Sequence, residues 1–285
     1  MFNFRTIALV SGTVVCAVGF LLFIPLITEI IYQSGSWQSY AVPILLYLIV
    51  GGALVITNRN LDLKISTKDA FVITTLSWIL FTILCSVPFI YSETDLSVVD
   101  AIFESMSGVT TTGATILSNL DQAPKGILIW RAVLQWLGGI GIIVIALVIL
   151  PFLRIGGMQL FHLEGDDPYD KFLPKISSVV SKIFIVYCIL TLVLFFLYYL
   201  NGMSIFDSIA HSFTTISTGG FSTHNDSFAY FNNITILNIA IIFMIIGSIP
   251  FLLLAQTTLN NFTLFKDHQV RILILILITA IAIVY

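Results

Sequence analysis

The chain has 285 residues, of which 58% are hydrophobic and only 9% are charged, and its formal net charge is −3. This composition excludes an ordinary soluble domain and is typical of a protein that crosses a membrane several times. A net charge so close to zero gives no reason to expect a nucleic-acid partner. The three cysteines lie far apart in apolar runs and show no disulfide or metal-ligand spacing.

Apolar segments that could be membrane spans recur along the whole chain, because a span needs about 20 mostly apolar residues. They cover residues 5–31, 40–57, 69–91, 127–152, 176–200, 234–256 and 271–285. The first is too long for the core of a signal peptide, so we expect it to be a retained span. Residues 247–250 should kink the sixth span, because Pro250 removes a backbone hydrogen bond.

Basic residues gather at alternate connections between the spans. They lie before the first span and after the second, fourth and sixth, whereas the other connections hold only Lys125, with Arg131 just inside the fourth span. The positive-inside rule therefore predicts a cytoplasmic N-terminus. We expect an acidic vestibule on the opposite, outer side, formed by Glu29, Glu93, Asp95, Asp100, Glu104, Asp121, Asp207 and Asp226.

Two stretches between spans match each other without a gap. Ser97–Thr115 reads SVVDAIFESMSGVTTTGAT, and Ser204–Ser222 reads SIFDSIAHSFTTISTGGFS. Each begins with a Ser-x-x-Asp signal that is typical of a helix N-terminus. Each then runs apolar for about three turns, which is too short to cross a bilayer, and ends in threonine, serine and glycine. Both copies are predicted to face the outer side.

The ends of these stretches predict a cation filter. In a membrane, backbone that leaves helical geometry must be buried in protein or line a watery cavity. Glycine permits the positive φ that turns successive carbonyls the same way, and such carbonyls can replace the hydration shell of a cation. One TTTG motif can be a simple turn, and one short helix can lie at the membrane surface. Two equally spaced copies on the same side favour re-entrant pore loops.

These features predict an all-α polytopic membrane protein built from span–pore helix–span repeats with re-entrant filter loops, similar to a potassium channel. We expect two leading transmembrane helices over residues 1–66 and a first pore repeat over 67–156. A second repeat with its cytoplasmic linker should follow over 157–265, and the start of a third over 266–285.

Longer motifs resemble the TrkH family, the potassium-transporting membrane subunits of bacterial Trk systems. They are SMSGVTTTGATIL, the segment LIWRAVLQWLGGIGIIVIALVILPFLRIGGMQLF at Leu128–Phe161, and HSFTTISTGGFSTHNDS at His211–Ser227. The resemblance implies potassium uptake across the inner (cytoplasmic) membrane, with no enzymatic activity and no cofactor besides the transported ion. It also implies a homodimer and a cytoplasmic nucleotide-binding regulator similar to TrkA. The potassium-binding residues that it implies are Thr110, Thr111, Thr112, Gly113, Ser217, Thr218, Gly219 and Gly220.

The resemblance also implies four repeats, and only two are present before the start of a third at Arg271. We therefore expect a fragment or a truncated product, rather than two chains that pair to complete the ring. On this interpretation residues 1–285 alone do not conduct.

Several further residues carry expectations. Gly138, Gly139 and Gly141 should permit close packing of helices. Arg131 should reach the outer surface or pair with an acid, with Asp121 as the suggested partner. Residues 162–170, which include His162 and several acids, should be a solvated loop or a docking patch for the regulator rather than a metal site.

Two other functions compete with a filter. An inverted-repeat secondary carrier for a monovalent cation such as sodium would also contain broken helices, but it would place one loop on each face of the membrane. An intramembrane enzyme would need histidine, aspartate or serine clustered at one depth. The sequence shows no such cluster, and His211 and Ser212 do not form a catalytic pair with an acid at a clear spacing.

Overall fold

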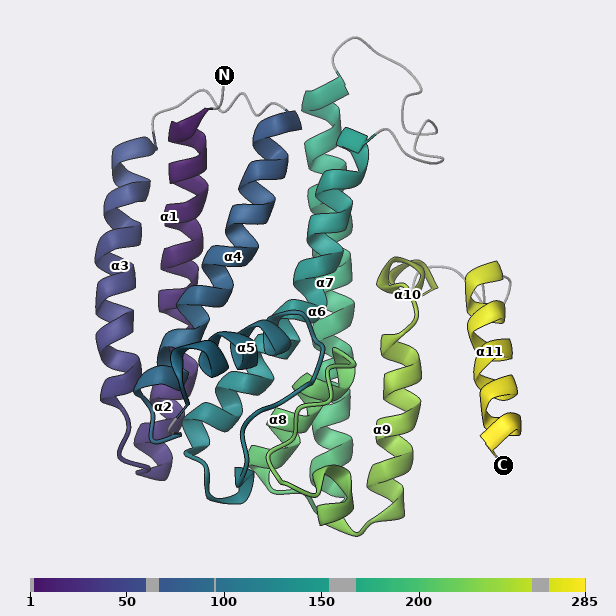
Figure 1. Cartoon of the computed structure of the whole chain (residues 1–285). Coiled ribbons are helices and arrows are strands. Elements are labelled where there is room, and N and C mark those ends of the chain that lie inside the picture. Colours follow the sequence, from purple (N-terminus) through teal and green to yellow (C-terminus); the bar gives the residue numbers. More distant parts are fainter. Residues whose placement is uncertain (1–2, 60–66, 95, 154–167, 258–266, 285) are drawn as a thin grey trace.

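The computed structural model describes the chain except for residues 1–2, 60–66, 95, 154–167, 258–266 and 285 (Figure 1). Between residues 142 and 177, and between 255 and 266, it describes no side chains. The described residues form helices and connecting loops without a strand. This confirms the predicted all-α class. Residues 162–167 of the predicted docking patch lie outside the described residues.

The N-terminal part of the chain is a packed group of long helices. These are α1 (Phe4–Leu21), α2 (Phe23–Tyr32), α3 (Gln38–Asn58) and α4 (Thr67–Tyr91). Helix α1 packs against both α3 and α4, and α2 packs against α6. The α1–α3 contact is close because it uses glycine on both helices: a β-carbon on Gly51 would lie 2.7 Å from the Cys16 sulfur.

Four helical stretches among the described residues are long and apolar enough to cross a membrane: Phe4–Tyr32, Gln38–Asn58, Lys68–Tyr91 and Ser178–Leu200. They coincide with the first, second, third and fifth predicted spans. The fourth predicted span lies within α6 (Lys125–Leu153), and the fifth lies within α7 (Pro168–Leu200). The predicted last span lies within α11 (His268–Val284).

The sixth predicted span is not one kinked helix. It is divided into α9 (Ile234–Gly247) and α10 (Phe251–Thr257), and Figure 1 shows α10 turned away from the axis of α9. Pro250 lies at the break, where its ring cannot donate the backbone hydrogen bond that would continue the helix. The predicted irregularity at residues 247–250 is therefore confirmed in position, but the helix is interrupted there and not only kinked.

Two short helices lie obliquely among the long ones at the same end of the bundle (Figure 1). They are α5 (Val98–Val109) and α8 (Ile205–Ile216), each of 12 residues. A helix of that length spans roughly 18 Å, well short of the hydrocarbon thickness of a bilayer. Short 3-10 turns, η1 (Leu120–Gln122) and η3 (Ser227–Phe231), follow the two loops.

Helix α6 joins the two halves of the fold. It packs against α5 and α8, and it also contacts α4 and α7. Trp130 on α6 is fully buried in the hydrophobic core formed largely by α1 to α6, whereas Trp136 packs against the second core formed by α7 to α10. Helix α6 is therefore the element that separates the two cores and against which both loops are positioned.

Candidate functional site

The two short helices begin with the same hydrogen bonds. In α5 the Ser97 hydroxyl accepts from the Asp100 backbone N–H and donates to the Asp100 carboxylate at 2.7 Å. In α8 the Ser204 hydroxyl does the same with Asp207, also at 2.7 Å. The predicted N-terminal signals are confirmed in both copies. Each helix therefore starts at a defined residue.

Both helices end in a Schellman motif, in which two backbone N–H groups beyond the helix bond back to carbonyls of its last turn. In the first copy Thr111 N donates to the Gly108 carbonyl and Thr112 N to the Ser107 carbonyl. In the second copy Thr218 N donates to Thr215, and Gly219 N donates to Thr214. These residues are equivalent in the ungapped repeat, so the two chain reversals are the same.

The left-handed residue of each motif is a threonine. The φ angle is 55° at Thr111 and 53° at Thr218, in a position where glycine is usual. A β-branched residue in this region is a true outlier, and such strain clusters at functional sites. The repeat therefore retains two threonines where glycine would be the easier choice, which indicates that their side chains are needed.

Left-handed backbone recurs two residues later in both loops. Gly113 has a φ of 78° and Gly220 a φ of 83°. In an extended chain, successive carbonyl groups point in alternate directions. A positive φ at every second residue reorients the peptide groups so that their carbonyls point the same way. The sequence indicated a positive φ at the two glycines but not at Thr111 and Thr218, because threonine as a residue type disfavours a positive φ.

The hydroxyl groups of the predicted ligands divide into two sets. Thr110 donates to the Met106 carbonyl and contacts Thr112, while Ser217 donates to the Phe213 carbonyl. Within the described part of the chain, the hydroxyls of Thr111 and Thr218 make no hydrogen bond to protein. The two strained threonines are thus the ones whose hydroxyls remain available to an ion.

The two loops touch each other. A β-carbon on Gly113 would overlap the carbonyl oxygen of Gly219. That carbonyl accepts a hydrogen bond from Gln135 Nε2 at 2.8 Å, and Gln135 Oε1 accepts from Phe221 N at 3.0 Å. The structure therefore brings residues 109–113 and 216–220 together at one place, with α6 behind them.

Glycines on the inner helices allow this close approach. A β-carbon on Gly138 would overlap the carbonyl oxygen of Val109, the last residue of α5. On α9, a β-carbon on Gly247 would lie 2.6 Å from the carbonyl oxygen of Ile216, the last residue of α8. Gly139 lies against Tyr187 and Ser217, whereas Gly141 faces open space. Close packing is confirmed for Gly138 and Gly139 and is wrong for Gly141.

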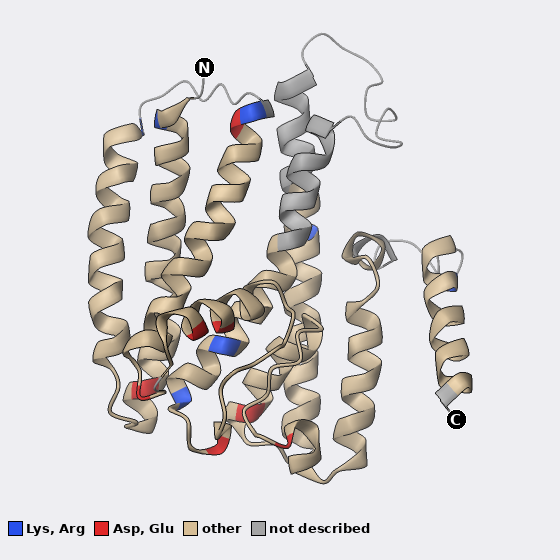
Figure 2. Ribbon diagram, viewed as in Figure 1, with Lys and Arg blue, Asp and Glu red and all other residues tan. Residues whose placement is uncertain are grey.

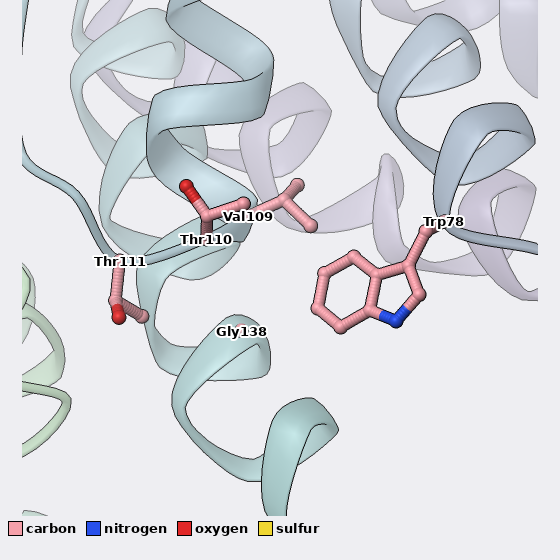
Figure 3. A pocket seen from close by; sticks show the side chains of 5 residues that line it. All are labelled: Trp78, Val109, Thr110, Thr111 and Gly138. Carbon is pink, nitrogen blue, oxygen red and sulfur yellow. The ribbon is translucent and has the colours of Figure 1, made fainter. Parts of the chain in front are cut away.

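Two cavities adjoin the loops. The smaller has a volume of about 190 Å³ and is lined by Trp78, Val109, Thr110, Thr111 and Gly138 (Figure 3). The Thr110 and Thr111 hydroxyls point in different directions in that view. The larger, of about 420 Å³, is lined by Thr111, Ser217 and Thr218 together with the break between α9 and α10. It is the space that both loops share.

Arg131 does not reach the surface, and its partner is not Asp121. The side chain is 1% exposed and its Nε lies 2.7 Å from Glu104 Oε1, with Glu104 fully buried. Arg131 and Gln135 lie one turn apart on α6, so both side chains face the two loops. Arg131 is therefore buried beside α5. The expected pairing of Arg131 with an acid is therefore confirmed, whereas the surface alternative and the suggested partner Asp121 were wrong. The buried position of Arg131 had a signal in the sequence, because Arg131 and Gln135 are two polar residues four apart in an otherwise apolar span.

A second polar cluster joins the segments that follow the two loops. Asp121 lies 2.6 Å from His224 Nδ1 and accepts from Asn225 Nδ2 at 2.7 Å, and Leu120 N donates to Asn225 Oδ1 at 2.9 Å. The hydrogen bond from His224 holds the pKa of the Asp121 carboxyl below its ordinary value. The segments that follow the two loops are thus tied together on one side of the molecule.

The predicted acidic vestibule is smaller than expected. Glu29 is 1% exposed and its Oε1 accepts from the Gly126 N–H at the start of α6, and Glu104 is held by Arg131. Asp207 is also buried and accepts from the Thr223 hydroxyl at 2.7 Å. These carboxylates organise the loops rather than face solvent, which the sequence pattern could not distinguish.

The fold and the paired loops together define a multi-pass, all-helical membrane protein with an internally repeated short-helix unit. The chain matches the model of the TrkH family, described as cation transport protein, over residues 37–285. Among curated proteins, it is 37% identical over 288 residues to the Trk system potassium uptake protein TrkH of Escherichia coli K12. That match covers 99% of this chain and 59% of the relative. It is 36% identical over 260 residues to TrkI of Halomonas elongata, covering 90% of this chain and 53% of the relative.

A solved structure agrees with these matches. The potassium transporter TrkH from Vibrio parahaemolyticus superposes with a TM-score of 0.87 at 34% identity, over 98% of this chain and 57% of that one. The chain therefore spans between half and three-fifths of the length of these relatives. It belongs to the TrkH family of cation transport proteins.

Proposed function

We propose that this protein takes up potassium ions across the inner (cytoplasmic) membrane, as part of a Trk-type transporter, through a filter to which both loops contribute. The observation that carries the proposal is the matched backbone of the two loops. Left-handed φ angles at Thr111 and Gly113 recur at Thr218 and Gly220, and aligned carbonyls of this kind can replace a cation's hydration shell. The relatives are named potassium uptake proteins.

The proposed ligands are oxygen atoms of residues 110–113 and 217–220. Thr111 and Thr218 line the shared cavity of about 420 Å³. The Gly219 carbonyl is oriented by Gln135, and a carbonyl has a second lone pair that an ion can use. The membrane potential supplies the driving force, because one charge moving through 100 mV gains about 2.3 kcal/mol.

The proposed orientation places the loops outside and the N-terminus in the cytoplasm. Figure 2 shows most acidic residues at the end of the bundle where α5 and α8 lie, and most basic residues of the first helices at the opposite end. The positive-inside rule assigns the basic end to the cytoplasm. A homodimer and a TrkA-like nucleotide-binding regulator on the cytoplasmic side complete the proposal.

An inverted-repeat carrier is the competing function, and the contact between Asp121 and His224 disfavours it. That contact ties the segments after both loops together, whereas inverted repeats would place them on opposite faces. Single cysteines at the exposed positions Glu93 and Asp226 test the difference in a variant without native cysteines. We expect a membrane-impermeant thiol reagent to label both from outside, and labelling of only one would favour the inverted carrier.

The function itself is tested with the complete natural gene. Expressed in bacteria without their own potassium uptake systems, it should restore growth at low potassium and rubidium uptake that potassium inhibits more strongly than sodium. Normal abundance in the membrane without such uptake would contradict the proposal.

A further inference from the structure

We propose that the buried pair Glu104–Arg131 is a positioning device that holds the two filter loops at a fixed separation and thereby sets the preference for potassium over sodium. The inference rests on the proposed function and adds residues outside the predicted ligands. It assigns a role to a charged pair that lies behind the loops and not among the oxygens that face the ion.

Arg131 contacts both loops at equivalent residues. Its Nη2 donates to the Thr115 hydroxyl and its Nη1 donates to the Ser222 carbonyl, each at 2.9 Å. Thr115 and Ser222 match in the ungapped repeat, and each lies two residues beyond the filter glycine of its own loop. The guanidinium carbon also lies 4.1 Å from the centre of the Phe221 ring. One rigid group therefore spans the distance between the two loops.

Glu104 fixes the first loop on the same side. Its Oε1 accepts from Arg131 Nε at 2.7 Å and from the Thr115 hydroxyl at 2.8 Å, and its Oε2 accepts from the Ile116 N–H at 3.0 Å. A fully buried carboxylate is tolerated when it is paired and hydrogen-bonded in this way. The pair thus connects helix α5, the first loop, helix α6 and the second loop.

The second repeat carries a neutral version of the same contact. His211 is equivalent to Glu104, and its Nε2 lies 3.1 Å from the Ser222 hydroxyl, just as Glu104 bonds the Thr115 hydroxyl. The inner helix of that repeat, α9, contains no charged residue between Ile234 and Gly247. The first repeat thus has a carboxylate, Glu104, where an arginine faces it, and the second repeat has an imidazole, His211, where its inner helix offers no arginine. This match indicates that the charge serves the link between the loops.

Arginine is needed because the contacts diverge. The planar guanidinium donates in three directions at once, to Glu104, Thr115 and Ser222, whereas an ammonium group is a compact charge on a flexible stem. Arg131→Lys keeps the positive charge beside Glu104 but cannot hold both loops. Because ion preference depends on where the oxygens are held, loosening this link should lower discrimination before it abolishes transport.

The test measures inhibition of rubidium uptake by potassium and by sodium, in uptake-deficient cells that express the complete natural gene product. Arg131→Lys and Glu104→Gln should each lower the potassium-over-sodium preference by about tenfold, at an abundance close to that of the parent protein. Arg5→Lys, a matched change at an exposed arginine, should leave the preference unchanged. A parental preference in both variants of the pair would overturn the proposal.

A double variant keeps the proposal testable if a single variant does not fold. Glu104→Gln with Arg131→Met removes both buried charges, so it avoids the unpaired arginine that Glu104→Gln alone leaves buried. Its preference should still be low, because Thr115 and Ser222 lose their common donor. If the double variant folds and keeps the parental preference for potassium over sodium, the pair does not position the loops and serves only the stability of the fold.

Gly113→Ala distinguishes failure of the positioning role from failure of the proposed filter function. If Gly113→Ala loses potassium preference while the Glu104 and Arg131 variants keep it, the positioning role fails and the filter stands. If Gly113→Ala also keeps the parental preference, the filter assignment fails.

Discussion

The carbonyl oxygen of Gly219 occupies the space that a β-carbon on Gly113 would need. Gly220, in contrast, has open space at the corresponding position. Both glycines have positive φ angles, so any side chain at either position adds backbone strain of about 1–2 kcal/mol. Of the two positions, only Gly113 is one where a side chain would also displace the other loop, at the Gly219 carbonyl.

We therefore expect Gly113→Ala and Gly113→Ser to lower the potassium-over-sodium preference by about tenfold or more, and Gly220→Ala to lower it less. Competition between rubidium, potassium and sodium in uptake assays gives this ratio directly. Equal effects of Gly113→Ala and Gly220→Ala would mean that backbone strain, and not contact between the loops, decides the outcome.

The left-handed threonines predict a trade between stability and ion binding. Thr218→Gly removes the strain of a β-branched residue at positive φ, which should stabilise the fold by up to about 1 kcal/mol. It also removes the hydroxyl, so the apparent affinity for potassium should fall. Thr218→Ala loses the same hydroxyl but keeps a β-carbon, so it should show the weaker affinity without the gain in stability. Thermal unfolding in detergent and uptake kinetics measure the two effects, and a glycine variant with parental affinity would contradict the role of the hydroxyl.

The inner-helix glycines provide a matched pair. Gly138→Ala drives a methyl group into the Val109 carbonyl and should reduce both stability and uptake. Gly141→Ala, one helical turn away in open space, should be neutral or stabilising by up to about 1 kcal/mol, because alanine is the better helix former. Thermal unfolding of the two variants decides this. Similar losses in both would indicate that helix flexibility, rather than space behind the loop, is the property required.

The link between Asp121 and His224 predicts a defined acid response. The pKa of Asp121 is below its ordinary value because His224 and Asn225 bond its carboxylate. A depressed carboxylate pKa stabilises the fold at pH values above the unfolded value of about 4, and this contribution is lost as the pH falls through the lowered folded pKa. Asp121→Asn should therefore be less stable than the parent at neutral pH, and the difference should disappear as the pH falls through the lowered folded pKa.

Thermal unfolding between neutral and strongly acidic pH measures that difference. Asp226→Asn is the control, since Asp226 lies exposed near Asn225 and, among the residues that the structure describes, its side chain makes no contact that joins the loops. A stability difference for Asp121→Asn that does not change with pH would show that the carboxylate acts only through its shape.

The sequence by itself determined the helical membrane class, most of the spans, the repeat and the ends of both short helices. These follow from local chemistry: apolar length, the Ser-x-x-Asp caps of α5 and α8, and the loss of helical preference at threonine and glycine. The same local rules predicted the irregularity at Pro250. They could not show that Pro250 separates two helices, because that depends on what packs against the freed carbonyls.

Only the tertiary structure decided which residues meet. Arg131 pairs with Glu104 and not with Asp121, and the Gly219 carbonyl lies against Gly113, because two loops that are distant in sequence meet each other and both pack on α6. Long-range contacts of this kind leave no periodic trace in a single chain. The positive φ of Thr111 and Thr218 is likewise imposed from outside, since threonine by itself avoids that conformation and only the packed surroundings of each loop hold it there.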